Sequence, residues 1–161
     1  MKAVIHSGYG APEKVLHIGE AQKPEPTERQ ALVRVRATSV NAGDWRSVYA
    51  TPAFIRLMGG LRRPRATELG GDVAGVVEAV GPDCELQPGQ EVFGIRHGAY
   101  AEYVAGEHFV AKPSNLGLEQ AAAVPIAGVT AVQALDKHGR LQPGESVLIH
   151  GAGGGVGSFA V

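Results

Sequence analysis

Three regularly spaced glycines near the C-terminal end of the sequence are the residues that point most directly to chemistry. They form a G-x-x-G-x-x-G pattern directly after the apolar run "SVLIH". A phosphate-binding turn needs small residues, because the backbone turns tightly, approaches a pyrophosphate and directs the first N–H groups of a helix at that anion. A glycine-rich turn of no special purpose stays open as the alternative, since the commoner spacing is G-x-G-x-x-G. The predicted cofactor contacts are Gly151, Gly154, Gly155, Val156 and Gly157.

Cysteine and histidine content bears on metal chemistry. The chain has one cysteine, Cys84, so no intrachain disulfide and no thiolate-rich zinc site can form. The histidines form no i,i+4 or short-loop pair, so each is expected at a surface or solvated position. They are His6, His17, His97, His108, His138 and His150. We therefore expect no metal, and we expect Cys84 to lie beside a turn without a chemical role.

The segments that must position these residues begin with short strands and turns up to Pro113. In "ALVRVRA" the apolar Val33, Val35 and Ala37 alternate with two arginines, which is typical of a half-buried strand. Gly75 predicts a bulge or corner in its strand. Short strands separated by such turns favour a small, partly open β-barrel. The expected strands are "KAVIH", "VLHIGEA", "ALVRVRA", "GDVAGVVEAVG", "LQPGQEVFGI" and the two halves of "AYAEYVAGEHFVAKP", divided at Gly106.

A change of pattern after Pro113 predicts a second domain. The alanine-rich stretch 114–139 indicates two helices, broken at Pro125 and closed by Gly139. "SVLIHG" is apolar enough to be a strand buried on both faces, as in a parallel sheet. We place the boundary within 113–128 and predict one domain at 1–125 and the beginning of another at 126–161.

Composition and charge narrow the class of protein. With 161 residues, 44% hydrophobic and 19% charged, the chain is expected to be globular. The net charge of −1, with basic residues scattered, indicates neither a nucleic-acid partner nor an anionic membrane. The start of the chain does not read as a secretory signal, and Ala121–Val132 is too short to cross a bilayer. A reducing, cytoplasmic location fits the cysteine content.

Four stretches of the sequence together resemble a known superfamily. They are "VRVRATSVNAGDWR", "LGGDVAGVVEAVG" followed by "LQPGQEVFG", "GAYAEYVAGEHFVAKP", and "AAAVPIAGVTAVQAL" with "GAGGGVG". In this order they resemble the medium-chain dehydrogenases/reductases, and within them the zinc-free quinone oxidoreductase (zeta-crystallin-like) branch. The resemblance implies a GroES-like catalytic domain followed by a Rossmann domain that binds NADPH, sometimes NADH. The fold expected is therefore α+β, mainly β with some helix: a partly open barrel, then the first strand and glycine turn of a Rossmann α/β domain.

The resemblance also implies a reaction and residues that perform it. Members of this branch transfer hydride from the nicotinamide to a quinone or an α,β-unsaturated carbonyl without zinc. The zinc-dependent members place a histidine where this chain has Gly71, and their first zinc ligand falls at or near Asn41. Asn41 is expected to meet the nicotinamide carboxamide or the substrate oxygen, Asp44 to anchor the loop or a water, and Tyr49 to donate a proton or stack. Thr130 is expected to contact the cofactor.

Plainer roles stay open for each of these residues. Asn41 would be a turn residue, Asp44 a helix N-cap before Trp45, and Tyr49 and Thr130 packing residues. Arg62, Arg63 and Arg65 would meet an acidic substrate or the adenine phosphate, or else form a solvated loop.

The resemblance leaves alternatives for the whole chain as well. A non-catalytic GroES-like interaction or structural module is one, and a zinc alcohol dehydrogenase is a weaker one. We interpret the chain as a fragment, inactive alone, of an enzyme that forms homodimers. The lone strand "SVLIHG" is expected to pair with another chain or to be mobile.

Overall fold

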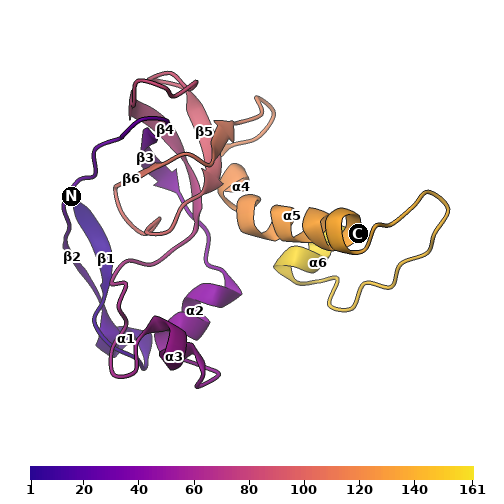
Figure 1. The fold of residues 1–161 in the computed structure, drawn as a ribbon, viewed down its shortest axis with the longest axis horizontal. Helices are drawn as coiled ribbons and strands as arrows, with labels where there is room; N and C mark the ends of the chain where they lie inside the picture. Colours follow the sequence, from indigo (N-terminus) through magenta and orange to yellow (C-terminus); the bar gives the residue numbers. More distant parts are fainter.

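The computed structural model describes residues 1–161, and its elements form two regions (Figure 1). Strands and three short helices make up the first region, from which α4 and α5 extend toward the C-terminus. The strands are β1 Lys2–His6, β2 Leu16–Glu20, β3 Ala31–Ala37, β4 Asp72–Val80, β5 Glu91–Ile95, β6 Tyr103–Gly106 and β7 Phe109–Ala111. The helices are α1 Pro12–Val15, α2 Ala42–Tyr49, α3 Ile55–Gly59, α4 Leu118–Ala122, α5 Pro125–Val132, a wide-turn π-helix at Gln133–His138, and α6 Gly155–Ala160.

The strands form two antiparallel sheets. Five of them pair in the order β6-β3-β4-β5-β7, and β1 pairs with β2. Two isolated bridges, Ala3–Ala101 and Ile5–Glu68, connect β1 to the segments just before β6 and β4. The expected α+β fold class is confirmed, with helices and strands in similar proportion, and every strand predicted before Pro113 is present. The two sheets do not close into a barrel.

Buried apolar side chains of β3 and β4 form the main hydrophobic core, on one face of the five-stranded sheet. Val33 on β3 and Val73 and Val77 on β4 are fully or almost fully buried, together with Phe109 of β7. Arg34 of β3 points to solvent, as its alternation with the valines predicts. On the other face of β4, Ala74 packs against Ala121 and Ala122 of α4. Small residues let this helix lie close to the sheet, so α4 and the start of α5 are held against the strands.

Gly75 lies at the irregularity that the sequence predicts. The register between β3 and β4 shifts between Val35 and Ala37, opposite Gly75 and Ala74. A Cβ atom at position 75 would lie 2.1 Å from the carbonyl oxygen of Arg34. Only glycine permits this approach of the two strands, so the bend in β4 requires it.

The helices after Pro113 agree with the prediction of two helices divided at Pro125. Proline stands at the first helical position of α5, where its missing N–H is not needed. The helix then widens over Gln133–His138 and ends at Gly139, whose N–H donates to the carbonyl of Ala134 at 2.8 Å. None of the helices combines the length and the apolar character needed to cross a bilayer.

The prediction of a strand at 146–151 is wrong. Residues 145–149 have no regular secondary structure, and Leu148 is 93% exposed. A strand needs neighbours to satisfy its N–H and C=O groups, and none of the strands of this chain pairs with it. The helix predicted after the glycines does form: α6 folds back beneath α5 (Figure 1), where Phe159 approaches Gly128.

Candidate active site

The loop between β3 and α2 carries the first two candidate residues. Asn41 precedes the first turn of α2 in an extended conformation, as an N-cap residue does. The carboxylate of Asp44, three residues on, accepts the backbone N–H of Asn41 at 2.7 Å. This bond is one half of a capping box and fixes the direction in which α2 leaves the sheet; the Asn41 side chain makes no hydrogen bond to the first turn of α2. Asp44 is therefore not the N-cap, which was the alternative considered for it.

A buried carboxylate, Asp72, lies beneath this loop at the start of β4. It is completely buried, and one carboxylate oxygen accepts from the side-chain amide of Asn41 at 2.7 Å and from the hydroxyl of Ser39. The other accepts the backbone N–H of Ile126 in α5 at 2.8 Å. Three neutral donors thus satisfy a buried charge that faces no cation. Asp72 consequently connects the β3–α2 loop to the helix that leads to the C-terminal region.

Tyr100 completes the group from the loop between β5 and β6. Its hydroxyl donates to the carboxylate of Asp44 at 2.9 Å and lies 3.2 Å from the carbonyl oxygen of Ser39. Burial, and then the neighbouring Asp44, raise the pKa of Tyr100 well above its usual value, because both disfavour a phenolate. Its ring packs over Gly70, which has a φ of +89° and where a Cβ atom would lie 2.5 Å from the ring. We call Ser39, Asn41, Asp44, Asp72 and Tyr100 the polar cluster.

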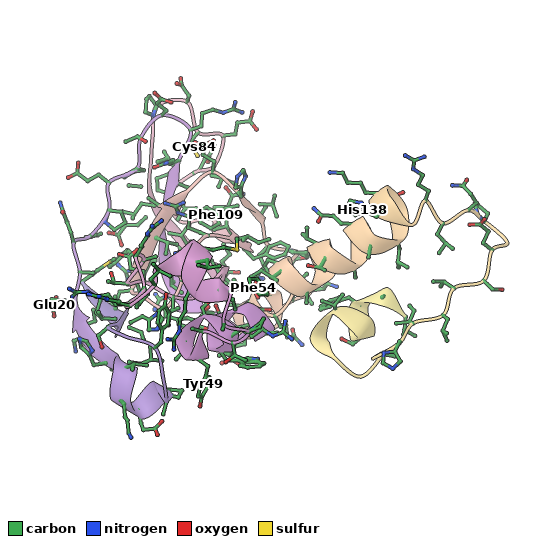
Figure 2. The ribbon with its side chains drawn as sticks, turned by 60° about the horizontal axis from the view of Figure 1, so that its bottom comes forward. Glu20, Tyr49, Phe54, Cys84, Phe109 and His138 are labelled. Atoms are coloured by element: carbon green, nitrogen blue, oxygen red, sulfur yellow. The ribbon has the colours of Figure 1, made fainter.

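The remaining predicted residues lie outside the polar cluster. Tyr49 is 44% exposed, its hydroxyl makes no hydrogen bond, and its ring meets Trp45 edge-on with centroids 6.4 Å apart. Figure 2 shows Tyr49 at the lower rim of the molecule. Thr130 is exposed on α5, and its hydroxyl donates to the carbonyl of Ile126 at 2.6 Å. The structure therefore brings Asn41 and Asp44 together and leaves Tyr49 and Thr130 apart from them.

The glycine pattern forms a compact turn into α6. Gly151 has a φ of +84°, and the N–H of Gly154 donates to its carbonyl at 2.9 Å. A Cβ atom at Gly157 would lie 2.2 Å from the carbonyl oxygen of Gly151. Gly155 and Val156 form the first turn of α6. The positive φ explains the glycine at position 151 and the close packing explains the one at 157. Contact of these residues with a cofactor stays a prediction.

Comparison with known proteins decides the family. Residues 27–115 match the family model described as the alcohol dehydrogenase GroES-like domain, and the chain is 39% identical over 166 residues to a quinone oxidoreductase of Pongo abelii. The chain belongs to the medium-chain dehydrogenase/reductase superfamily, in its quinone oxidoreductase branch. It is also 34% identical over 177 residues to a 2-methylene-furan-3-one reductase of Solanum lycopersicum.

Solved structures of this superfamily have the same fold over almost the whole chain. A quinone oxidoreductase from Coxiella burnetii superposes with a TM-score of 0.83 at 34% identity, covering 99% of this chain and 51% of that one. A mycobacterial protein solved in complex with NADPH superposes with a TM-score of 0.81 at 28% identity, covering 99% and 47%. The alignments cover 99% of this chain and 48% of the Pongo abelii relative, and 100% and 43% for the tomato relative. The chain thus spans about half the length of the medium-chain reductases that it matches.

The position at which zinc-dependent medium-chain dehydrogenases carry a histidine is closely packed in this chain. A Cβ atom at Gly71 would lie 2.5 Å from the Cδ1 atom of Ile126. No group of three or more His, Cys, Asp or Glu side chains is arranged to hold a metal ion. The α5 side chain of Ile126 therefore lies where a side chain at position 71 would begin.

Sequence reasoning missed three members of the polar cluster and misplaced one histidine. Asp72 had a usable signal, since it is the one charged residue in the apolar stretch "LGGDVAGVV". Ser39 and Tyr100 had none, because the carboxylates to which they donate, Asp72 and Asp44, lie 33 and 56 positions away. The prediction that every histidine is solvated is wrong for His6, which is 2% exposed because β1 packs it inside the first region. Burial lowers its pKa, with a hydrogen bond to the backbone of Gly8 acting in the opposite direction.

Proposed function

We propose that this chain is the catalytic-domain half of a cytoplasmic NAD(P)H-dependent oxidoreductase that reduces a quinone or an α,β-unsaturated carbonyl without zinc. The observation that carries the proposal is the polar cluster, in which Asp72 orients the side chain of Asn41 at 2.7 Å and simultaneously holds α5 at 2.8 Å. The relatives named quinone oxidoreductase and furanone reductase support the same chemistry. We assign the catalytic domain to residues 1–125 and the beginning of the cofactor domain to 126–161.

The residues of the C-terminal region fit the beginning of a dinucleotide site. The turn that begins at Gly151 leads directly into α6, and Gly157 in that helix approaches the carbonyl of Gly151 too closely for any side chain. A dinucleotide site needs this close packing of turn and helix. The bound nicotinamide would supply the hydride, and the protein supplies orientation and electrostatics. In this proposal Gly151 and Gly154–Gly157 would hold the cofactor, and Thr130 would contact it from α5.

The hydrogen bonds that Asn41 already makes determine which atom of its side chain is free to bind a ligand. Its amide nitrogen has two hydrogens, and it lies 2.7 Å from Asp72 and 3.2 Å from Ser39. Both donors are therefore used inside the polar cluster, which leaves the carbonyl oxygen of the amide as the free group. An acceptor suits the NH₂ of a nicotinamide carboxamide and repels a substrate carbonyl. We accordingly assign Asn41 to the cofactor rather than to the substrate oxygen.

A donor for the substrate oxygen must then come from elsewhere. The hydroxyl of Tyr100 is engaged by Asp44, and that of Ser39 by Asp72. Tyr49, one of the residues predicted from the sequence, has a hydroxyl with no partner, on the exposed face of the same helix that Asn41 begins. We assign Tyr49 as the donor that polarises the acceptor, because negative charge develops on its oxygen during hydride transfer.

The test is kinetic and uses the protein that carries this chain together with its cofactor-binding half. NADPH oxidation is followed with 1,4-benzoquinone and with 3-penten-2-one for the parent, N41A and Y49F. We expect N41A to raise the KM for NADPH, and Y49F to lower kcat by about 10²-fold with little change in that KM. Parent activity with neither acceptor would overturn the proposal, and so would about one zinc per chain in the dialysed enzyme.

A further inference from the structure

The surface formed by α2, α3 and the loop after them is unlike the rest of the molecule. We call it the α2–α3 face. Its apolar members are Trp45, Phe54, Leu57, Met58 and Leu61, and its basic members are Arg46, Arg56, Arg62, Arg63 and Arg65. The stretch 45–67 contains five of the ten arginines of the chain and no lysine, aspartate or glutamate. The net charge of −1 for the whole chain conceals this concentration.

The positive charge of the α2–α3 face has no counterpart within the chain. The four ion pairs of the structure involve Met1, Lys23, Arg34 and Lys112, and none of the five arginines. The guanidinium of Arg46 lies 5.4 Å from the ring centre of Trp45, and that of Arg56 lies 5.2 Å from that of Tyr9. Stacking on a ring leaves the charge available, so the face attracts an anionic partner.

The apolar side chains of the face protrude into solvent. Phe54, Leu57, Met58 and Leu61 are 59%, 70%, 77% and 67% exposed. Four such residues within eight positions form a patch of the kind that marks an interaction site. Of the four, Met58 lines a space of about 270 Å³ beside α3. A small molecule binds in a concave site, so these protruding side chains suit an extended partner.

A lipid bilayer is the partner that these observations favour. Phospholipid headgroups supply the anions, and arginine pairs with phosphate bidentately. The hydrocarbon just below accepts protruding aromatic and aliphatic side chains without the matching pocket that a protein would have to provide. Arginines interspersed with Trp, Phe and Leu, here on two short exposed helices and the loop after them, are the composition of a segment that lies in the membrane interface. We propose that the α2–α3 face docks onto the surface of an anionic phospholipid bilayer.

Trp45 makes the proposal directly testable with the 161-residue chain. It is the only tryptophan of the sequence, belongs to the face and is 46% exposed. The protein is titrated with phosphatidylcholine vesicles containing 30% phosphatidylglycerol and with vesicles of phosphatidylcholine alone. Binding is read from the blue shift of Trp45 emission and from co-sedimentation. We expect binding to the anionic vesicles, weakened by salt, and little binding to the neutral ones.

Matched variants locate the interaction. Each arginine near an anionic surface contributes about a fivefold factor to partitioning, so R62Q/R63Q should bind about 25-fold more weakly. The control R29Q/R140Q removes two exposed arginines elsewhere and should bind as the parent does. L57S should weaken binding about tenfold, because it removes an apolar side chain that would enter the hydrocarbon. Circular dichroism confirms that each variant is folded.

Three outcomes would overturn the proposal. Absence of binding to anionic vesicles would show that another partner, such as an acidic protein or a further part of a longer chain, covers the face. If R62Q/R63Q and R29Q/R140Q weakened vesicle binding equally, binding would depend on the overall charge of the protein and not on the α2–α3 face. Unchanged binding of L57S, with no shift in Trp45 emission, would place the contact elsewhere on the molecule. None of these results bears on the proposed catalytic function, which does not depend on membrane binding.

Discussion

Replacing Asp72 should destabilise the protein far more than replacing another carboxylate on the same strand. Asp72→Ala leaves three donors without their acceptor: the hydroxyl of Ser39, the amide of Asn41 and the N–H of Ile126. A hydrogen bond to a charged group contributes about 1.5–3 kcal/mol. Because Ser39 and Asn41 are partly exposed and can bind water instead, we expect a loss of about 3–4 kcal/mol in the free energy of unfolding. Asp72→Asn should lose less, since its amide oxygen can still accept from one side.

Glu78 provides the matched control for this measurement. It also lies on β4, but its carboxylate pairs with Lys23 and Arg34 at the surface. Solvent screens such pairs, so Glu78→Ala should change the free energy of unfolding far less than Asp72→Ala.

Urea denaturation followed by circular dichroism measures all three variants, and hydrogen exchange reports the amide of Ile126 in Asp72→Ala, which has no side-chain acceptor left for it. If Asp72→Ala cost no more than Glu78→Ala, or if the Ile126 amide kept its protection, Asp72 would not connect α5 to the loop as described.

Three further predictions concern Gly70, Tyr100 and His6. Gly70→Ala should destabilise the fold by about 2–4 kcal/mol in urea denaturation, because a Cβ atom would strain a φ of +89° and strike the ring of Tyr100. Tyr100→Phe should lose about 1–2 kcal/mol at neutral pH. Since folding raises the pKa of Tyr100, the parent's advantage should shrink as pH rises above about 10, and a constant difference would contradict this. Folding lowers the pKa of His6, so the parent should lose stability as pH falls below about 6.5, a slope that His6→Phe should reduce in thermal melts at several pH values.

The parts of the fold that were predictable are those whose determinants are local. The alternation of Val33 and Val35 with arginines fixes the faces of β3 without knowledge of its neighbours, and Pro125 divides two helices wherever they pack. The strand expected at 146–151 depends instead on neighbours, and its apolar character could not reveal that no strand pairs with it. The same distinction applies to the site. Asn41 and Asp44 are three residues apart and are joined by a local hydrogen bond, whereas Asp72 and Tyr100 join them from segments about 30 and 56 positions away.

His6 illustrates the limit of reasoning from residue type alone. A lone histidine is usually solvated, and nothing in "KAVIH" distinguishes its histidine from the other five. Its burial follows from tertiary packing, because His6 is buried whereas Lys2, on the same face of β1, is exposed.

The hydrogen bond from the N–H of Ile126 to Asp72 lies at the base of a long helical arm. From Pro125 to His138 the helical arm continues through α5 and the wide turns, a reach of about 20 Å. A tilt of about 10° at its base would therefore move the far end by about 3–4 Å, roughly the separation of two atoms in contact. The direction of everything that the arm carries is therefore set at its base, by the bond to Asp72 together with the packing of Ala121 and Ala122 on β4. A small change in tilt there is enough to make or break a hydrogen bond at the far end.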